Sequence, residues 1–192
     1  MAAVLNAGPA LEPVTLAQAK AYLRVDSADE DDLILSLITA ARISAELQIN
    51  RLLIEQSWSV FMDCWPGHGH LKVPLGPLIR VDAVQVYGAD DVAAPVDPAH
   101  FFVDQASHPA RISLRMGRTW PQPGRTLNGI ELMIACGYGA SADAVPEPLR
   151  QAVLQLVAHW FENREPVVLG QSPMHIPQMV SALLAPYRVV NI

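Results

Sequence analysis

The sequence predicts an α+β protein: a bundle of about four helices with an inserted, small antiparallel β unit. Apolar residues recur at helical spacing near both ends of the chain, and short alternating runs broken by Pro, Gly and Asp fill the middle. Of the 192 residues, 51% are hydrophobic and 17% are charged, a globular composition. We expect N-terminal helices of the bundle in residues 1–55, the inserted β unit in 56–137, a core helix of the bundle in 138–165 and a separate C-terminal segment in 166–192.

The first two predicted helices each begin at a capping box, in which two side chains satisfy backbone N–H groups of the first turn. Thr15 and Gln18 form the box of a short helix over residues 13–25. Ser27 and Glu30 repeat the pattern before a longer helix, and the aspartates that follow suit the positive end of its dipole. The apolar residues of this second helix recur to about residue 53: Leu33, Ile34, Leu37, Ile38, Ala41, Ala45 and Leu52.

The middle of the chain changes from helical period to alternation. About five or six short strands are predicted there, including residues 57–62, 81–86, Phe101–Asp104, Arg111–Leu114 and Ile130–Cys136. The segment from Trp65 to His70, with two glycines and a proline, is predicted to be a hairpin turn between strands.

Helical spacing returns after Pro146. The apolar face of this third helix is formed by Leu149, Ala152, Val153, Leu156, Val157 and Trp160. Its opposite face carries Arg150, Gln151, Gln155, His159 and Glu162. Pro166 is expected to stop it, and a last short helix is predicted from about Gln178 to Leu184, before Pro186.

The charge balance restricts the classes of partner. The chain has 13 basic and 19 acidic residues, a net charge of −6, which argues against a protein that grips nucleic acid over a broad surface. An acidic wall past which nucleic acid slides is compatible with this charge, because it repels phosphate. No apolar stretch reaches the roughly 20 residues of a membrane span, so we expect no membrane partner.

The sequence offers no convergent catalytic or metal-binding set. Cys64, His68 and His70 lie close together, but a fourth zinc ligand is missing. Gly137-Tyr-Gly139 lacks the lysine and the following helix of a phosphate-binding loop, and no Gly-x-Ser-x-Gly elbow occurs. We therefore expect no catalytic residues, no metal and no cofactor, and a small hydrolase or nucleotide-binding enzyme is a remote alternative.

A local basic patch stands out in this acidic chain. No acidic residue occurs between Asp104 and Glu131. That stretch contains Arg111, Arg115, Arg118 and Arg125, with Trp120 among them. Two interpretations remain: the arginines are solvated or paired within the chain, or they contact an acidic partner subunit or DNA phosphates.

Several segments follow one another along the chain in a recognisable order. The first half contributes Thr15-Leu-Ala-Gln-Ala-Lys-Ala-Tyr-Leu-Arg-Val25 and, after an acidic turn, Leu37-Ile-Thr-Ala-Ala-Arg42. The second half contributes Gly137-Tyr-Gly139, Val145-Pro146, Leu149-Arg-Gln-Ala-Val153, His159-Trp160-Phe161-Glu-Asn-Arg-Glu165, Leu183-Leu184 and Pro186-Tyr-Arg188. Together these segments resemble the head–tail connector (adaptor) proteins of tailed phages and of phage-like gene transfer particles. The β-rich middle is similar only in layout, with a Val-Pro-Leu-Gly-Pro-Leu block at residues 73–78.

This resemblance implies a structural role without catalysis. It implies a ring of identical subunits, a dodecamer, that sits beneath the portal protein and extends the DNA channel. The ring would offer a platform to a stopper or tail-completion protein, and DNA would pass through its lumen without sequence-specific binding. The expected location is the neck of a virion or phage-like particle, assembled in the cytoplasm of the bacterial host.

The resemblance also singles out interface candidates. Residues 166–192 are expected to dock onto the portal, and Leu183, Leu184, Tyr187 and Arg188 join the four arginines as candidate interface residues. The alternative function is another neck component, such as a stopper or tail-completion protein. A β-dominated core with poorly formed helices would favour that alternative.

Overall fold

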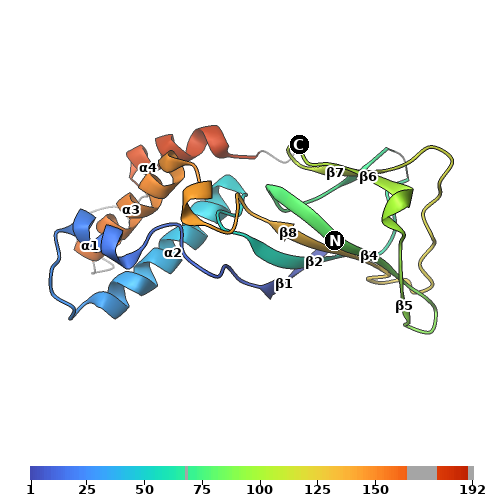
Figure 1. Ribbon diagram of the computed structural model, residues 1–192, viewed down its shortest axis with the longest axis horizontal. Coiled ribbons are helices and arrows are strands. Elements are labelled where there is room, and N and C mark those ends of the chain that lie inside the picture. Colours follow the sequence, from blue (N-terminus) through green and yellow to red (C-terminus); the bar gives the residue numbers. More distant parts are fainter. Residues whose placement is uncertain (68, 164–176, 190–192) are drawn as a thin grey trace, which may run out of the picture. The chain divides into compact units, whose positions relative to one another are not determined.

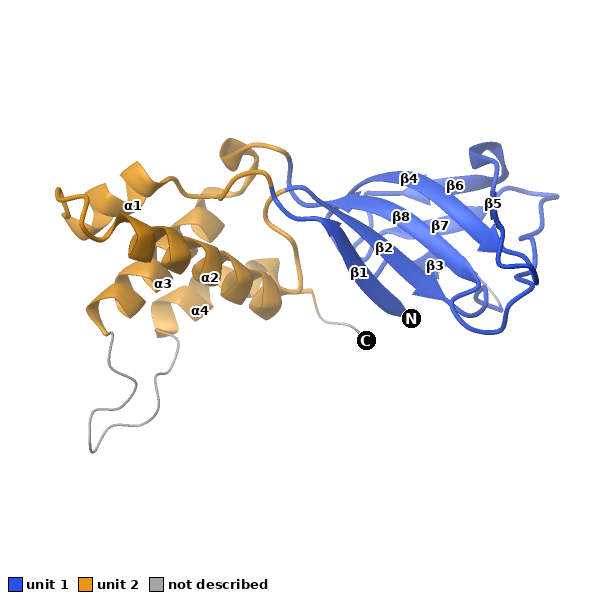
Figure 2. Ribbon diagram, turned by 90° about the horizontal axis from the view of Figure 1, so that it is seen from below, with its two compact units in different colours: residues 1–9, 55–139 blue, residues 10–54, 140–192 orange. Residues whose placement is uncertain are grey.

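The computed structural model describes residues 1–67, 69–163 and 177–189. The chain divides into two compact units (Figure 2). Residues 1–9 and 55–139 form the β unit, and residues 10–54 with the described part of 140–192 form the helical unit. The predicted α+β class is confirmed.

The described part of the helical unit contains four α-helices, as predicted (Figure 1). They are α1 (Leu16–Leu23), α2 (Asp31–Ile49), α3 (Glu147–Glu162) and α4 (Gln178–Leu184). Helix α2 packs against α3 and α1, and α4 covers α3. Large apolar side chains from α2 and α3, among them Ile34, Ile38 and Leu156, are fully buried in this bundle.

Of the two predicted capping boxes, only the first forms. The Thr15 hydroxyl accepts from the Gln18 backbone N–H at 3.2 Å, and the Gln18 side chain accepts from the Thr15 N–H at 3.0 Å. The second prediction is wrong: α2 begins at Asp31, and its N-cap Glu30 has no capping side-chain bond to the described residues. The Ser27 hydroxyl instead accepts from the Asp29 backbone N–H at 3.3 Å, which closes a local turn before the helix.

Two residues with left-handed backbone conformation end the first two helices. Arg24 (φ 58°) follows α1, and Asn50 (φ 55°) follows α2. The second helix therefore ends at Ile49, before the predicted position near residue 53, because a residue in this conformation stops the helical hydrogen-bond ladder. Leu52 and Leu53 remain buried, in the segment that leaves the helix.

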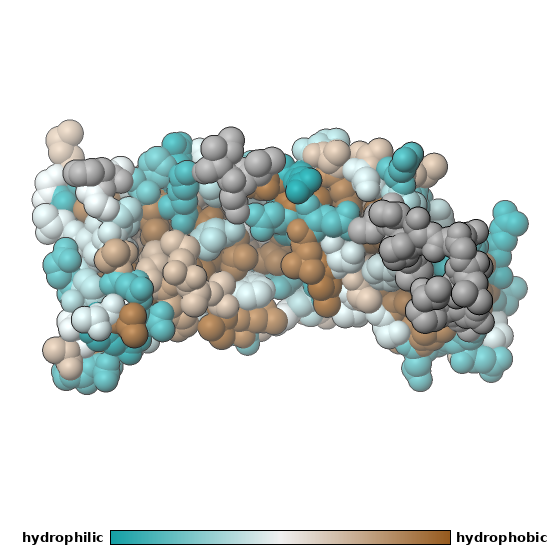
Figure 3. All heavy atoms as spheres, turned by 180° about the vertical axis from the view of Figure 1, so that it is seen from behind, coloured by the Kyte–Doolittle hydropathy of each residue, from teal (hydrophilic) through white to brown (hydrophobic). Residues whose placement is uncertain are grey.

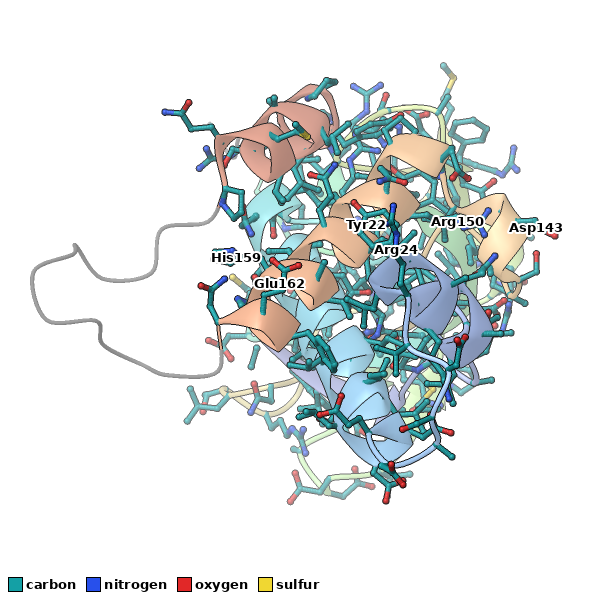
Figure 4. All side chains as sticks on the ribbon, turned by 90° about the vertical axis from the view of Figure 1, so that its left-hand side faces the viewer. Tyr22, Arg24, Asp143, Arg150, His159 and Glu162 are labelled. Carbon is teal, nitrogen blue, oxygen red and sulfur yellow. The ribbon has the colours of Figure 1, made fainter. Side chains whose placement is uncertain are left out.

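Helix α3 carries its predicted apolar face into the bundle, and its polar side chains lie along the opposite side (Figure 4). At its start, Arg150 donates to the Glu147 carboxylate at 3.1 Å and to the Pro13 carbonyl at 3.2 Å. His159 and Glu162 lie at its other end (Figure 4). Arg150 thus links α3 to the segment that precedes α1.

A largely buried ion cluster on α2 binds two other segments of the same chain. Arg42 donates to Glu12 at 2.7 Å and to Glu46 at 2.9 Å. Glu46 also accepts from the Leu53 backbone N–H at 2.9 Å, and Thr39 donates to Glu12 at 3.0 Å. The cluster therefore holds the segment before α1 and the segment after α2 against the same helix.

The described part of the β unit contains two antiparallel sheets. The five-stranded sheet has the order β1 (Ala2–Ala7), β2 (Gln56–Met62), β8 (Ile130–Cys136), β4 (Leu78–Tyr87) and β5 (Ala93–Pro95). The three-stranded sheet has the order β3 (Leu71–Lys72), β7 (Arg111–Leu114) and β6 (Phe101–Asp104). Strands β6, β7 and β8 have the predicted bounds.

Strand β1 was not predicted, because its residues were grouped with the N-terminal helices. It pairs with β2 from Ala2 opposite Phe61 to Ala7 opposite Ser57. All six of its residues are exposed, so the alternation that reveals a half-buried strand is missing from its sequence. Its place at the edge of the sheet is decided by pairing with β2.

The segment from Trp65 to His70 is not the predicted hairpin turn. Strand β2 precedes it in the five-stranded sheet, whereas β3 follows it in the three-stranded sheet. The Trp65 ring stacks on Trp120 with centroids 4.1 Å apart, and its indole N–H donates to the Pro121 carbonyl at 2.7 Å. These contacts hold the crossing segment against the long connection between β7 and β8.

A row of polar side chains crosses the five-stranded sheet. Glu131 on β8 is buried and accepts from the hydroxyls of Ser59 at 2.7 Å and Tyr87 at 2.6 Å. Asn6 on β1 donates to Ser59 at 2.9 Å. The hydrogen bond to Glu131, followed by burial, raises the pKa of Tyr87. The row links four adjacent strands, including the exposed edge strand β1.

Candidate interaction surfaces

The structure places Arg111 on β7 and the other three arginines of the predicted basic patch between β7 and β8. Arg111 makes two bonds to one oxygen of Asp104, at 2.6 and 2.9 Å. A hydrogen bond from the Ser107 hydroxyl, together with Arg111, holds the pKa of Asp104 well below its ordinary value. Arg111 is therefore paired within its own unit.

Arg125 and Arg115 also contact their own unit. The Arg125 guanidinium lies 3.9 Å from the centre of the Tyr87 ring, and it donates to the Asn128 carbonyl at 2.6 and 3.0 Å. Arg115 donates to the Phe101 carbonyl at 3.2 Å. Both arginines thus stabilise the connections around the strands.

Arg118 differs from the other three arginines. It is exposed, and its side chain makes no hydrogen bond or ion pair with the residues that the structure describes. Its backbone N–H donates to the Arg115 carbonyl at 3.1 Å, which closes a turn just after β7. Within the patch, Arg118 is the guanidinium most open to an acidic partner.

The C-terminal interface candidates have unequal exposure. Leu184 is only 3% exposed and belongs to the core of the helical unit, whereas Arg188 is exposed. Leu183 and Tyr187 are half-buried. The Val189 backbone N–H donates to the Ile49 carbonyl at 2.9 Å, so this stretch is fastened to the end of α2. Residues 166–176 and 190–192 of the proposed docking segment lie outside the described residues.

A groove of about 410 Å³ in the β unit lies between the edges of β4 and β6. Its lining includes Arg80, Asp82, Phe102, Gln105 and Arg115. Gln105 donates to the Ile79 carbonyl at 2.6 Å across one end of the groove. Arg80 is paired with Glu55 and Asp82, and the described lining residues include no nucleophile.

The remaining candidate catalytic and metal-binding residues form no common site among the residues that the structure describes. Within the described ranges, no group of three or more His, Cys, Asp or Glu residues could hold a metal ion, and His68 lies outside those ranges. Cys64 is exposed, whereas burial raises the pKa of the Cys136 thiol to about 12. Gly137 has φ 139° and donates to the Pro77 carbonyl at 2.8 Å, so it serves a turn after β8.

None of the helices that the structure describes combines the length and the apolar character needed to cross a membrane. On the face of the molecule shown in Figure 3, hydrophobic side chains instead reach the surface in several separate patches.

Sequence reasoning missed one surface of the helical unit. On the exposed side of α2, Leu33, Ser36, Ala40, Ile43 and Leu47 follow one another at intervals of three and four residues. We call these five residues the α2 stripe. The spacing of seven residues between Leu33, Ala40 and Leu47 could have revealed the stripe. These residues lie beside the buried face of α2 rather than within it.

Three solved structures contain chains similar to this one. A chain in the virion of a native gene transfer agent particle is 24% identical with a TM-score of 0.81, and the match covers 100% of this chain and 97% of that one. A chain in the neck of an empty gene transfer agent particle, computed with C6 symmetry, is 27% identical with a TM-score of 0.79. A chain in the neck of a native particle, computed with C12 symmetry, is 26% identical with a TM-score of 0.73. Both neck matches cover 98% of this chain and 97% of the other.

Neither the family models nor the curated proteins compared with the sequence gave a match. The structural similarity nevertheless extends over both units, including the β-rich middle, for which the sequence resembled the connector proteins only in layout. The predicted resemblance to a neck protein of a phage-like particle is thereby confirmed.

Proposed function

We propose that this chain is a structural subunit of the neck of a phage-like particle, where it forms an adaptor ring beneath the portal protein. One observation carries the proposal: two solved neck structures contain a chain with the same fold, matched over nearly the full length of both proteins. In this role the chain joins capsid to tail and extends the DNA channel, without catalysing a reaction. A ring of twelve copies agrees with the C12 symmetry of one of those necks.

The helices favour an adaptor over a stopper or tail-completion protein. A stopper was expected to have a β-dominated core and poorly formed helices. Here α2 has 19 residues and α3 has 16, and both contribute fully buried side chains to a common core. The helical unit therefore has a buried core of its own, formed by well-defined helices.

The charge of the chain suits a channel for DNA. The net charge of −6 repels phosphate, which lets a duplex slide without adhering. Three arginines of the basic patch are engaged within the β unit, and Arg118 is left to meet an acidic surface of a neighbouring protein. We assign the portal contact to residues 166–192, with Arg188 as its exposed described cation.

Location in the particle is the direct test. Particles from a producing strain that carries an epitope-tagged copy of this chain are purified, and the chain is localised by cryo-electron microscopy with bound antibody fragments. Density at the neck, in about twelve copies, is the expected result. Antibody density on the capsid shell or the tail tip, or a chain that is absent from purified particles, would refute the proposal.

The portal contact has its own test. Deletion of residues 170–192 would remove Val180 and Leu184 from the core of the helical unit, so it would confuse unfolding with lost binding. Arg188→Glu avoids this, because the residue is exposed. We expect weaker binding to purified portal protein, with an unchanged circular dichroism spectrum. Equal affinity of the variant and the wild type would remove Arg188 from the contact.

A further inference from the structure

The α2 stripe is a largely apolar surface that the described residues of the helical unit leave exposed. Leu47 is 78% exposed and Ile43 is 45% exposed, although apolar side chains of this size are usually buried. Ala40, Ile43, Ser44, Leu47 and Gln48 line an open groove of about 500 Å³ on this side of the helix. Single exposed apolar residues need no explanation, but a continuous line of them marks an interaction site.

The surface around the stripe has no charge. From Leu33 to Gln48 the helix contains two charged residues, Arg42 and Glu46. Both are buried and bonded to each other, and to Glu12 and the Leu53 backbone, away from the stripe. A helix surface of about 21 Å, at 1.5 Å per residue, is therefore apolar or neutral in a chain with 32 charged residues. Depletion of charge is typical of the buried centre of an interface.

The spacing of the stripe indicates the shape of its occupant. Leu33, Ala40 and Leu47 are seven residues apart, and Ser36 and Ile43 repeat at the same distance between them. This pattern keeps one seam of a helix facing a second helix that crosses it at a shallow angle. A strand, which presents side chains at a period of two, does not match it.

The symmetry of the similar necks indicates which protein supplies the second helix. A neck with C12 symmetry contains a chain of this fold, so copies of that chain repeat around one axis. In a closed ring each subunit contacts its two neighbours through two different surfaces. We propose that the α2 stripe is one of these two surfaces, and that a helix of the adjacent copy of this chain covers it. This inference rests on the proposed function and adds the contact that closes the ring.

Two matched substitutions test the stripe. Ile43→Glu places a charge in the seam. Leu35→Glu places the same charge on the same helix, at a residue that is also 45% exposed but lies outside the stripe. Particles are produced with each variant, and the number of copies per particle is measured by quantitative mass spectrometry against the capsid protein. Circular dichroism of each purified full-length chain verifies that α2 still forms.

We expect wild-type copy numbers for Leu35→Glu and at least a tenfold loss for Ile43→Glu. Equal incorporation of both variants would overturn the assignment of the stripe while leaving the neck location intact. A wild-type chain missing from the particles would instead refute the proposed function, and the inference with it. The two failures are thereby distinguished.

A photocrosslink identifies the occupant. The photoreactive residue p-benzoylphenylalanine replaces Gln48, which lines the groove beside the seam, and assembled particles are irradiated. A product with twice the mass of the chain, linked by peptide mapping to a helix of the second copy, supports the proposal. A crosslink from position 48 to a different neck protein, or to no protein, contradicts it.

Discussion

The helical unit and the β unit both bury a glutamate, and they satisfy its charge with different partners. In the helical unit, Glu46 accepts from the Arg42 guanidinium and from the Leu53 backbone. In the β unit, Glu131 accepts from the hydroxyls of Ser59 and Tyr87. The nearest cationic contact of that row is Arg125, which lies over the Tyr87 ring. One unit therefore depends on an ion cluster and the other on neutral donors.

The difference teaches how each unit is held together. The ion cluster joins segments that are far apart in sequence to a single helix, so its loss frees two chain segments at once. The hydroxyl row joins strands that backbone hydrogen bonds already connect. We therefore expect the helical unit to be more sensitive to loss of its buried polar group than the β unit.

The largest expected effect is that of Arg42→Ala. The substitution removes the Arg42 guanidinium from the buried Glu46, and breaking one side of a buried ion pair costs about 3–5 kcal/mol. The free energy of unfolding is measured by urea denaturation. Arg80→Ala is the control, because Arg80 pairs with Glu55 and Asp82 at the surface, where solvent screening makes the expected loss much smaller. Equal losses in the two variants would contradict the importance of burial.

Glu131→Gln is expected to have the next largest effect. The amide keeps one acceptor oxygen for two hydroxyl donors, so one buried donor loses its partner, at about 1–3 kcal/mol. Thermal unfolding monitored by circular dichroism measures the change, with Glu55→Gln as the control outside the polar row. If Glu131→Gln lowered the stability of the fold more than Arg42→Ala does, the β unit and not the helical unit would be the more sensitive to loss of its buried polar group.

The two predicted capping boxes give a matched pair within the helical unit. Thr15→Ala removes the hydroxyl that caps α1 and should cost about 1 kcal/mol of unfolding free energy. Ser27→Ala removes a hydroxyl from an exposed turn that caps no helix, so we expect a change of less than about 0.5 kcal/mol. Denaturant titration of the two variants side by side measures both. If Ser27→Ala proved the more costly change, the assigned start of α2 would be wrong.

The smallest expected effect is that of pH on the half-buried pair of Asp104 and Arg111 in the β unit. The pKa of Asp104 is lower in the folded chain than in the unfolded chain, because Ser107 and Arg111 bond to its charged form. The pair therefore stabilises the fold above the unfolded pKa of Asp104, and this contribution disappears as the pH falls through the folded pKa.

Arg111→Ala should move the pKa of Asp104 back toward its ordinary value, as measured by nuclear magnetic resonance titration of the side-chain carboxyl. Arg118→Ala is the control, since the Arg118 side chain makes no hydrogen bond or ion pair with the described residues. A titration of Asp104 that Arg111→Ala leaves unchanged would show that Ser107 alone accounts for the shift.

Much of the helical unit could be predicted from the chain itself. The i, i+3, i+4 spacing of α2 and α3, the capping box at Thr15 and the bounds of α4 depend on residues close together in sequence. The error at Ser27 arose where a local turn competed with the helix. The helix end was placed too late because Asn50, a residue type that favours the left-handed conformation after a helix, was not used as a stop signal.

The candidate site was less predictable than the fold. The sequence placed four arginines in one stretch without acidic residues, but Asp104 at its border and Asp91 outside it pair with two of them. Leu184 was a candidate contact because of the resemblance, and the fold buries it. Whether a charged or apolar side chain is free for a partner depends on contacts between segments far apart in sequence, which no local pattern records.

The sequence by itself determined the α+β class, the main helices and five of the strands, three of them with their bounds, because amphipathic period and capping are properties of neighbouring residues. Only the tertiary structure decided that residues 2–7 form an edge strand, that the segment after β2 crosses between two sheets, and that the described residues leave one side of α2 uncovered. The physical reason is that strand pairing and burial depend on which distant segments of the chain come into contact. The identity of an apolar residue does not tell whether its side chain is exposed or buried.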